Sequence, residues 1–115
     1  DSKGKYIDDN DDFLYGDKAP APIIVKENAV NFAIYLDDGA MVGIFLDQRE
    51  VRKTIRDKYA KGKSFLNTFS YTGAFSVYAA LGGATKTTSV DLAKRSLAKT
   101  SEQFSVNNVD TTSQD

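Results

Sequence analysis

The residues best placed to do chemistry are a glycine-containing turn, Phe69–Gly73, and Asp91, which follows 18 positions after the glycine. Glycine lets the backbone of such a turn approach a ligand closely, and the helix that follows offers unpaired N–H groups and a positive dipole end. An acidic residue about 20 positions after the turn can accept hydrogen bonds from both hydroxyls of a ribose. Together these features predict a site for an adenosine-type cofactor.

Each half of this site also has a plainer explanation. The Gly73 turn could be an ordinary strand-to-helix connection, and Asp91 could cap a helix that begins at Leu92. Their joint spacing in a β-α-β frame favours the ligand-binding interpretation. A single glycine argues against a dinucleotide pyrophosphate, which needs close backbone approach at several points. A cofactor without phosphates, such as S-adenosylmethionine, needs only room for a methionine tail.

A basic stretch, residues 47–63, carries seven basic and three acidic residues and holds a second candidate group. Asp47 could cap a helix here, which would leave Arg49, Arg52 and Arg56 on a solvated face. Alternatively, Arg49 could hold a carboxylate by a bidentate pair, and the basic face could meet a phosphate backbone or the carboxylate of a cofactor.

The composition excludes several classes of chemistry. The 115 residues contain no cysteine and no histidine, which rules out a disulfide scaffold, a Cys/His zinc site, a thiol nucleophile and an imidazole acid or base. A net charge of −1 argues against nucleic-acid binding through bulk charge. Neither a signal peptide nor an apolar run of about 20 residues is present, so we expect a cytoplasmic protein without a membrane partner.

The elements that position the candidate site begin with a small antiparallel β unit, residues 23–46. Alternating apolar residues predict strands over 23–25, 30–36 and 41–46, with turns at Glu27-Asn28 and at 37–39. The acidic residues 1–22 indicate a lead-in or linker.

Residues 47–115 follow the order expected of the opening half of a doubly wound parallel α/β sheet. Strands are predicted over 64–68 and 85–90. Helices are predicted over 47–62, with an apolar stripe of Val51, Ile55 and Tyr59, over 74–81, and over 92–107, with an inward face of Leu97, Thr100, Ser101 and Phe104.

Several separate motifs resemble one family in the expected order. The run from Gly43 to Arg52 resembles the G-x-F-L-D-Q-R-x-x-R signature of class I S-adenosylmethionine-dependent RNA methyltransferases, the large-subunit ribosomal RNA cytosine-5 enzymes and their Gram-positive relatives. Residues 66–77 resemble the family's first cofactor motif, and residues 82–84 and 88–91 match its next elements. The resemblance implies a Rossmann-like class I methyltransferase sheet, here its first half.

The resemblance also implies roles for individual residues. The cofactor would be S-adenosylmethionine, with Asp91 binding the ribose hydroxyls. The methionine part would be lined by Phe69, Ser70, Tyr71, Thr72 and Gly73, and the pocket would be bordered by Asp47, Gln48 and Arg49. The substrate would be RNA, ribosomal RNA in this family.

The sequence departs from the family pattern in ways that limit its activity. The cytosine-5 reaction needs a cysteine thiolate and a target-base motif, and neither is present. We therefore expect an inactive cofactor-binding fragment with no catalytic residue of its own. Sheet edges left unpaired by such a truncation could invite homodimerisation.

Two other functions stay open at this point. One is a nucleotide- or NAD-binding module of the Rossmann type. The other is a non-catalytic RNA-interaction module that uses the basic stretch 47–63, with Arg52, Lys53 and Arg56 contacting phosphates.

Overall fold

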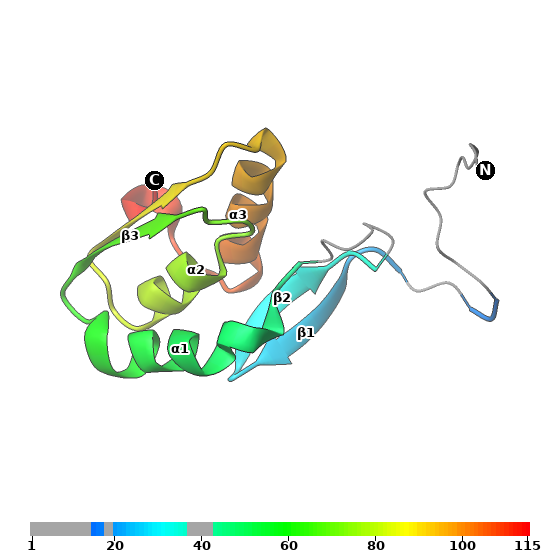
Figure 1. The fold of residues 1–115 in the computed structure, drawn as a ribbon, viewed down its shortest axis with the longest axis horizontal. Coiled ribbons are helices and arrows are strands. Elements are labelled where there is room, and N and C mark those ends of the chain that lie inside the picture. The colour runs from blue at the N-terminus through cyan, green and yellow to red at the C-terminus, as the bar shows by residue number, and fades with distance from the viewer. Residues whose placement is uncertain (1–14, 18–19, 37–42) are drawn as a thin grey trace.

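The computed structural model describes residues 15–17, 20–36 and 43–115 (Figure 1). Its elements, in chain order, are β1 (Ile23–Glu27), β2 (Val30–Ile34), a 3-10 turn (Leu46–Gln48), α1 (Arg49–Thr54), a π-helical segment (Ile55–Tyr59), β3 (Ser64–Thr68), α2 (Ala74–Leu81), β4 (Lys86–Val90), α3 (Lys94–Val106) and a second 3-10 turn (Thr111–Ser113). None of these helices has both the length and the apolar content needed to cross a membrane.

The first two strands form an antiparallel hairpin in which Ile23 pairs with Ile34 and Glu27 with Val30. Asn28 and Ala29 form its turn with φ angles of 50° and 69°, as a two-residue hairpin turn requires. The turn expected at Glu27-Asn28 is therefore present but lies one residue later, because Glu27 still belongs to β1. The second expected turn, at 37–39, lies outside the described residues, as do positions 41 and 42. The rest of the expected return strand is wrong, because residues 43–45 form no strand and Leu46 begins a 3-10 turn.

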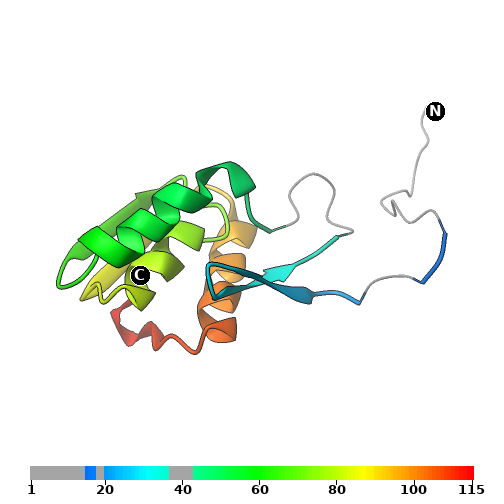
Figure 2. The same cartoon turned by 90° about the horizontal axis from the view of Figure 1, so that it is seen from below.

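The second half of the chain confirms the α/β class and the β-α-β order. Strands β3 and β4 are parallel, with Ser64 opposite Lys86 and Thr68 opposite Val90. Figures 1 and 2 show α1 and α2 together on one side of this sheet, and the inward residue Asn67 donates to Ser76 of α2 at 3.1 Å. On the other face Leu66 is 64% exposed.

The hairpin docks on α3 through side-chain amides that take the place of a neighbouring strand. Gln103 accepts the N–H of Ala33 at 2.9 Å and donates to the carbonyl of the same residue at 3.0 Å. One helical turn later, Asn107 makes the same pair of bonds with Asn31, at 2.8 and 2.7 Å. These four bonds satisfy the edge of β2, and Figure 2 shows the hairpin lying beside α3.

The hydrophobic core joins the hairpin to the helices of the α/β unit. Its buried members come from β2, α2 and α3, and they are Val30, Phe32, Ile34, Ala74, Val77, Tyr78 and Phe104. Burial of this apolar surface, together with the amide bonds of α3, fixes the hairpin against the part of the chain that carries the candidate site.

Three details of the predicted helices are wrong. Asp47 lies within the 3-10 turn and caps no helix, since α1 begins two residues later without a side-chain cap. In the expected apolar stripe, Val51 is 49% and Tyr59 67% exposed. On α3, which begins at Lys94, the expected inward residues Leu97 and Ser101 are exposed, while Ser96, Thr100, Gln103 and Phe104 are buried. The reason for the last difference is that α3 faces the hairpin through its amide side chains.

Candidate cofactor-binding site

The turn between β3 and α2 has a strained backbone. Phe69, Tyr71 and Gly73 all have left-handed φ angles, of 54°, 53° and 78°. Left-handed conformations are costly for the two aromatic residues, and such strain clusters at functional sites. Gly73 is required for a second reason, because a Cβ at this position would lie 2.5 Å from Cγ2 of Thr100.

The structure brings Asp91 into direct contact with this turn. One carboxylate oxygen accepts the backbone N–H of Tyr71 at 3.0 Å, and the other accepts the N–H of Ala93, also at 3.0 Å. These bonds, that from Ala93 first and that from Tyr71 second, hold the pKa of Asp91 below its ordinary value of 3.8. Asp91 is not the residue that caps α3, because the helix starts at Lys94 with Ala93 in the cap position.

A cavity of about 280 Å³ opens between the turn and the segment that precedes α1. It brings together five residues predicted from the sequence to form the cofactor site, namely Asp47, Gln48, Phe69, Ser70 and Tyr71. The other lining residues are Ile44, Phe45, Arg52, Ala74 and Phe75. Of these, only Arg52 was a candidate from the sequence, as part of the basic face that could meet phosphates or a cofactor carboxylate. Two signals could have identified them, since all five lie within the two family-like motifs.

The remaining predicted residues lie next to the cavity without lining it. The Thr72 hydroxyl donates to the carbonyl of Gly43 at 2.6 Å, while the N–H of Gly43 donates to the Tyr71 hydroxyl at 3.0 Å. This pair of bonds holds the segment before α1 against the turn. Arg49 is exposed, and its Nε lies 3.9 Å from a carboxylate oxygen of Glu50.

Ser70 supplies the polar atom that most clearly lacks a partner. The residue is 6% exposed, and its Oγ makes no hydrogen bond within the described part of the chain. Buried hydroxyls are almost always hydrogen-bonded, and the exceptions call for an explanation such as an absent ligand. The position of Ser70 on the cavity wall offers that explanation.

Two apolar side chains near Asp91 and the turn are exposed. Phe69 is 88% exposed, and Leu92, the residue directly after Asp91, is completely exposed. Large apolar side chains in such positions provide surface for a flat apolar ligand group. Phe69 was predicted as a site residue from its motif, whereas Leu92 was not, because its only signal is its place beside Asp91.

The expected solvated basic face is wrong for Arg52. This residue is 2% exposed, and its Nε and Nη2 donate to the two carboxylate oxygens of Glu27 at 2.9 and 2.8 Å. Lys53 and Arg56 lie nearer the surface and both pair with Asp57, at 3.1 and 2.8 Å. An arginine is buried where a carboxylate compensates its charge, and here that carboxylate comes from the hairpin.

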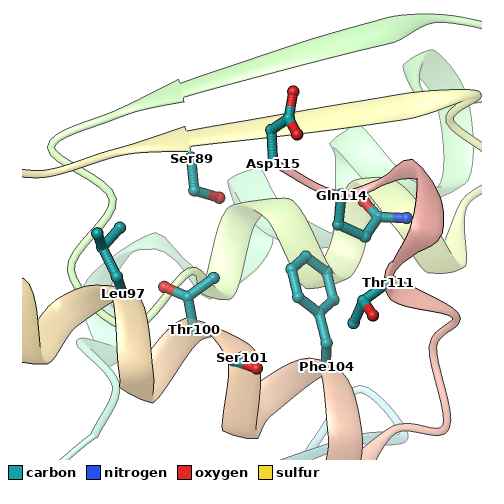
Figure 3. Close-up of a pocket in the computed structure, with 8 residues that line it drawn as sticks. All are labelled: Ser89, Leu97, Thr100, Ser101, Phe104, Thr111, Gln114 and Asp115. Atoms are coloured by element: carbon teal, nitrogen blue, oxygen red, sulfur yellow. The ribbon is translucent and has the colours of Figure 1, made fainter.

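A second cavity, of about 260 Å³, lies between α3 and the C-terminal segment (Figure 3). Figure 3 shows Phe104 pointing from α3 toward this segment, whose last residue, Asp115, accepts the N–H of Ser89 at 2.7 Å. None of the cofactor-site residues predicted from the sequence lines this cavity. Because five of the predicted residues line the first cavity, we take that cavity as the candidate cofactor site.

The family model and the relatives that match this chain are all described as methyltransferases. A family model described as "S-adenosylmethionine-dependent methyltransferase" matches residues 4–114. Over 110 residues the chain is 67% identical to the "Putative ribosomal RNA large subunit methyltransferase YwbD" of Bacillus subtilis, covering 96% of the chain and 28% of that protein. It is 44% identical over 94 residues to the ribosomal RNA large subunit methyltransferase K of Neisseria meningitidis, covering 82% of the chain and 26% of that protein.

Among solved structures, "A putative sam-dependent methyltransferase from Streptococcus mutans" superposes with a TM-score of 0.84 at 51% identity, over 88% of this chain and 27% of that one. A structure described as a methyltransferase "complexed with SAH" gives the same values. The chain thus spans little more than a quarter of the length of these relatives.

Proposed function

Because the chain belongs to the S-adenosylmethionine-dependent methyltransferase family, we propose that its cavity and the adjacent Asp91 form the cofactor site of an enzyme that methylates ribosomal RNA. The names of the relatives support ribosomal RNA as the substrate. Cytosine C5 is proposed as the methylated position from the family resemblance of the motifs. The cofactor supplies a methyl group on a sulfonium centre, so the protein mainly has to position two reactants.

The unpartnered hydroxyl of Ser70 is the observation that carries this proposal. A polar ligand group in the cavity would give that buried oxygen the partner it lacks. The cavity, at about 280 Å³, is slightly smaller than most ligand pockets, whose sizes begin at roughly 300 Å³. That size suits the methionine part of the cofactor, with the adenosine part outside it near Asp91.

The side chains around the cavity match the chemistry of the cofactor. Asp91 is ionised at neutral pH, as its pKa lies below the ordinary 3.8, and an ionised carboxylate can accept hydrogen bonds from both ribose hydroxyls. Leu92 provides exposed apolar surface for the adenine ring, while Phe69 lines the cavity and stays with the methionine part. At the other end, Asp47 offers a carboxylate to the ammonium group of the methionine part, and Gln48 offers an amide.

Three further residues shape this site without lining its cavity. Thr72 holds the segment before α1 against the turn, and Gly73 allows α2 to start close to Thr100. We place Arg49 at the rim, where its exposed guanidinium is available to an anionic group. We assign contact with RNA phosphates to Lys53 and Arg56. Arg52 is left out of this contact because it is buried.

Calorimetric titration of the complete protein with S-adenosylhomocysteine tests the cofactor assignment. We expect one molecule bound per chain and a raised melting temperature, since a ligand that binds only the folded state stabilises it. NADH serves as the comparison ligand, because it also carries an adenosine group but has the pyrophosphate of a dinucleotide. Stabilisation by NADH and not by S-adenosylhomocysteine would overturn the proposal.

The RNA substrate requires a separate test. Ribosomal RNA from cells that lack the protein should miss one methyl group, which mass spectrometry of nuclease fragments would locate. A missing group on a base other than cytosine would refute the C5 assignment while leaving the methyltransferase function intact.

A further inference from the structure

Arg52 is the largest of the fully buried side chains among the described residues. It leaves α1 and reaches both the hairpin and the wall of the candidate cofactor cavity, which it lines. Its guanidinium lies 5.6 Å from the ring centre of Phe75 and 5.9 Å from that of Tyr78. The side chain is therefore enclosed by the hairpin, α1 and α2 at once.

The Arg52 guanidinium binds two groups, and the first is the carboxylate of Glu27, the last residue of β1. Both carboxylate oxygens accept from Arg52, and the Tyr78 hydroxyl adds a bond of 2.7 Å to one of them. Burial raises the pKa of Glu27, but the hydrogen bonds from Arg52 and Tyr78 outweigh burial and set the pKa below its ordinary value of 4.5. Glu27 itself does not line the cavity, so it makes no direct contact with a ligand there.

The second group that Arg52 binds is the backbone carbonyl of Phe45, which accepts a hydrogen bond from Nη2 at 2.8 Å. Phe45 lines the cavity, and its ring packs on Tyr71 with 4.7 Å between ring centres. Asp47 and Gln48 follow two and three residues later on the same wall. The position of the Phe45 carbonyl therefore sets where these two polar side chains lie relative to the turn.

We propose that Arg52 is a positioning residue of the cofactor site, which uses Glu27 as its anchor and holds the wall from Phe45 to Gln48 against the turn. This inference rests on the proposed cofactor-binding function. It gives the hairpin a part in the site, since the anchor belongs to β1.

The geometry requires arginine. A planar guanidinium can bind a carboxylate with two parallel bonds and still donate to a third acceptor, whereas a lysine ammonium is a compact charge without this fork. Lysine at position 52 would keep the charge opposite Glu27. It would lose the simultaneous hold on Phe45.

The test is calorimetric titration with S-adenosylhomocysteine of the complete protein carrying Arg52→Lys, at a temperature where circular dichroism shows the variant folded. We expect affinity to fall by about tenfold or more, the scale of one lost hydrogen bond to a charged group. Wild-type affinity in the folded variant would overturn the positioning role. Failure of the wild-type protein to bind would instead overturn the proposed function, and this inference with it.

Gln103→Met is the matched control. Gln103 is also a fully buried polar residue that holds the hairpin, but it acts from α3 and does not line the cavity. We expect this variant to melt at a lower temperature while its folded form binds within about twofold of wild type. An equal loss of affinity in Gln103→Met would show that hairpin docking in general, and not Arg52, controls the site.

Glu27→Gln keeps the inference testable if Arg52→Lys does not fold. The substitution preserves shape and leaves Arg52 in place but weakens its anchor. Because Glu27 does not line the cavity, we expect the weakened anchor to act through Arg52 and to lower affinity by about threefold or more in the folded variant. Unchanged affinity in Glu27→Gln would contradict the role of Glu27 as the anchor.

Discussion

The Asp91 carboxylate accepts the backbone N–H of Tyr71 at 3.0 Å, so the acid at the end of one strand is tied to the turn at the end of its neighbour. A second bond, from the N–H of Ala93, goes to the other carboxylate oxygen. A carboxylate has about four acceptor sites on its two oxygens, so it can accept from backbone N–H groups and from a ligand hydroxyl as well.

Replacing Asp91 by alanine should therefore weaken binding of S-adenosylhomocysteine by about tenfold or more, because hydrogen bonds to a charged group are lost. Titration calorimetry on the complete protein measures the change. Asp110→Ala is the matched control, since Asp110 also accepts a backbone N–H two residues along, from Thr112 at 3.0 Å, and lies outside the candidate site. Equal affinities for wild type and Asp91→Ala would remove Asp91 from the site.

Ser70→Ala should separate binding from stability. Its Oγ has no partner within the described chain, so its loss should leave the free energy of unfolding within about 0.5 kcal/mol of wild type while cofactor affinity falls several-fold. Urea unfolding and calorimetry measure the two quantities.

Ser76→Ala provides the opposite case. Its buried Oγ bonds Asn67 at 3.1 Å and Ser89 at 2.7 Å, so this variant should lose about 1–3 kcal/mol of stability. A Ser70→Ala protein that is destabilised to the same extent would show that the hydroxyl has a structural partner.

Gly73→Ala should destabilise the protein by more than about 2 kcal/mol, because a positive φ and a contact of 2.5 Å with Thr100 act together. Gly62→Ala is the control for backbone strain alone, since Gly62 has a φ of 74° and nothing within 4 Å of the added Cβ. We expect a cost near 1 kcal/mol there. Equal costs at the two positions, measured by urea unfolding, would contradict the close approach to Thr100.

The Glu27–Arg52 pair predicts how stability depends on pH. A carboxyl group whose pKa is lowered by folding stabilises the native state above its unfolded pKa and loses that effect as pH falls through the folded pKa. The pKa of Glu27 is lowered from 4.5, so part of the stability should disappear as pH falls below that value.

Urea midpoints between about pH 7 and pH 3 measure this loss, which Glu27→Gln should reduce. Glu50→Gln, the same substitution at a side chain that is 79% exposed, is the matched control. Parallel profiles for wild type and Glu27→Gln would show that the pair contributes nothing to the pH dependence.

The order of elements from 64 to 91 could be predicted because each has a local signal. Strand β3 and helix α2 were predicted with the residue bounds that the structure shows, and Gly73 marked the turn between them. The contact of Asp91 with that turn followed from a general rule, since the carboxyl ends of parallel strands meet at one edge of a sheet.

The burial of Arg52 could not be predicted, because its partner Glu27 lies 25 positions earlier and in a different element. The spacing of Val51 and Tyr59 indicated an apolar stripe by periodicity alone. Periodicity cannot show that the neighbouring hairpin presents a carboxylate to this helix. The amide bonds from α3 to the hairpin were missed for the same reason.

Those amide bonds also limit how this region can change length. Gln103 and Asn107 are four residues apart on a helix, a rise of about 6 Å, and they meet Asn31 and Ala33, two residues apart on a strand, about 6.8 Å. The spacing of the amides along the helix therefore matches the spacing of their partners along the strand over this single step only. One residue inserted between the amides would turn the second by about 100° away from the strand, so substitutions on the outer side of α3 should be tolerated where insertions are not.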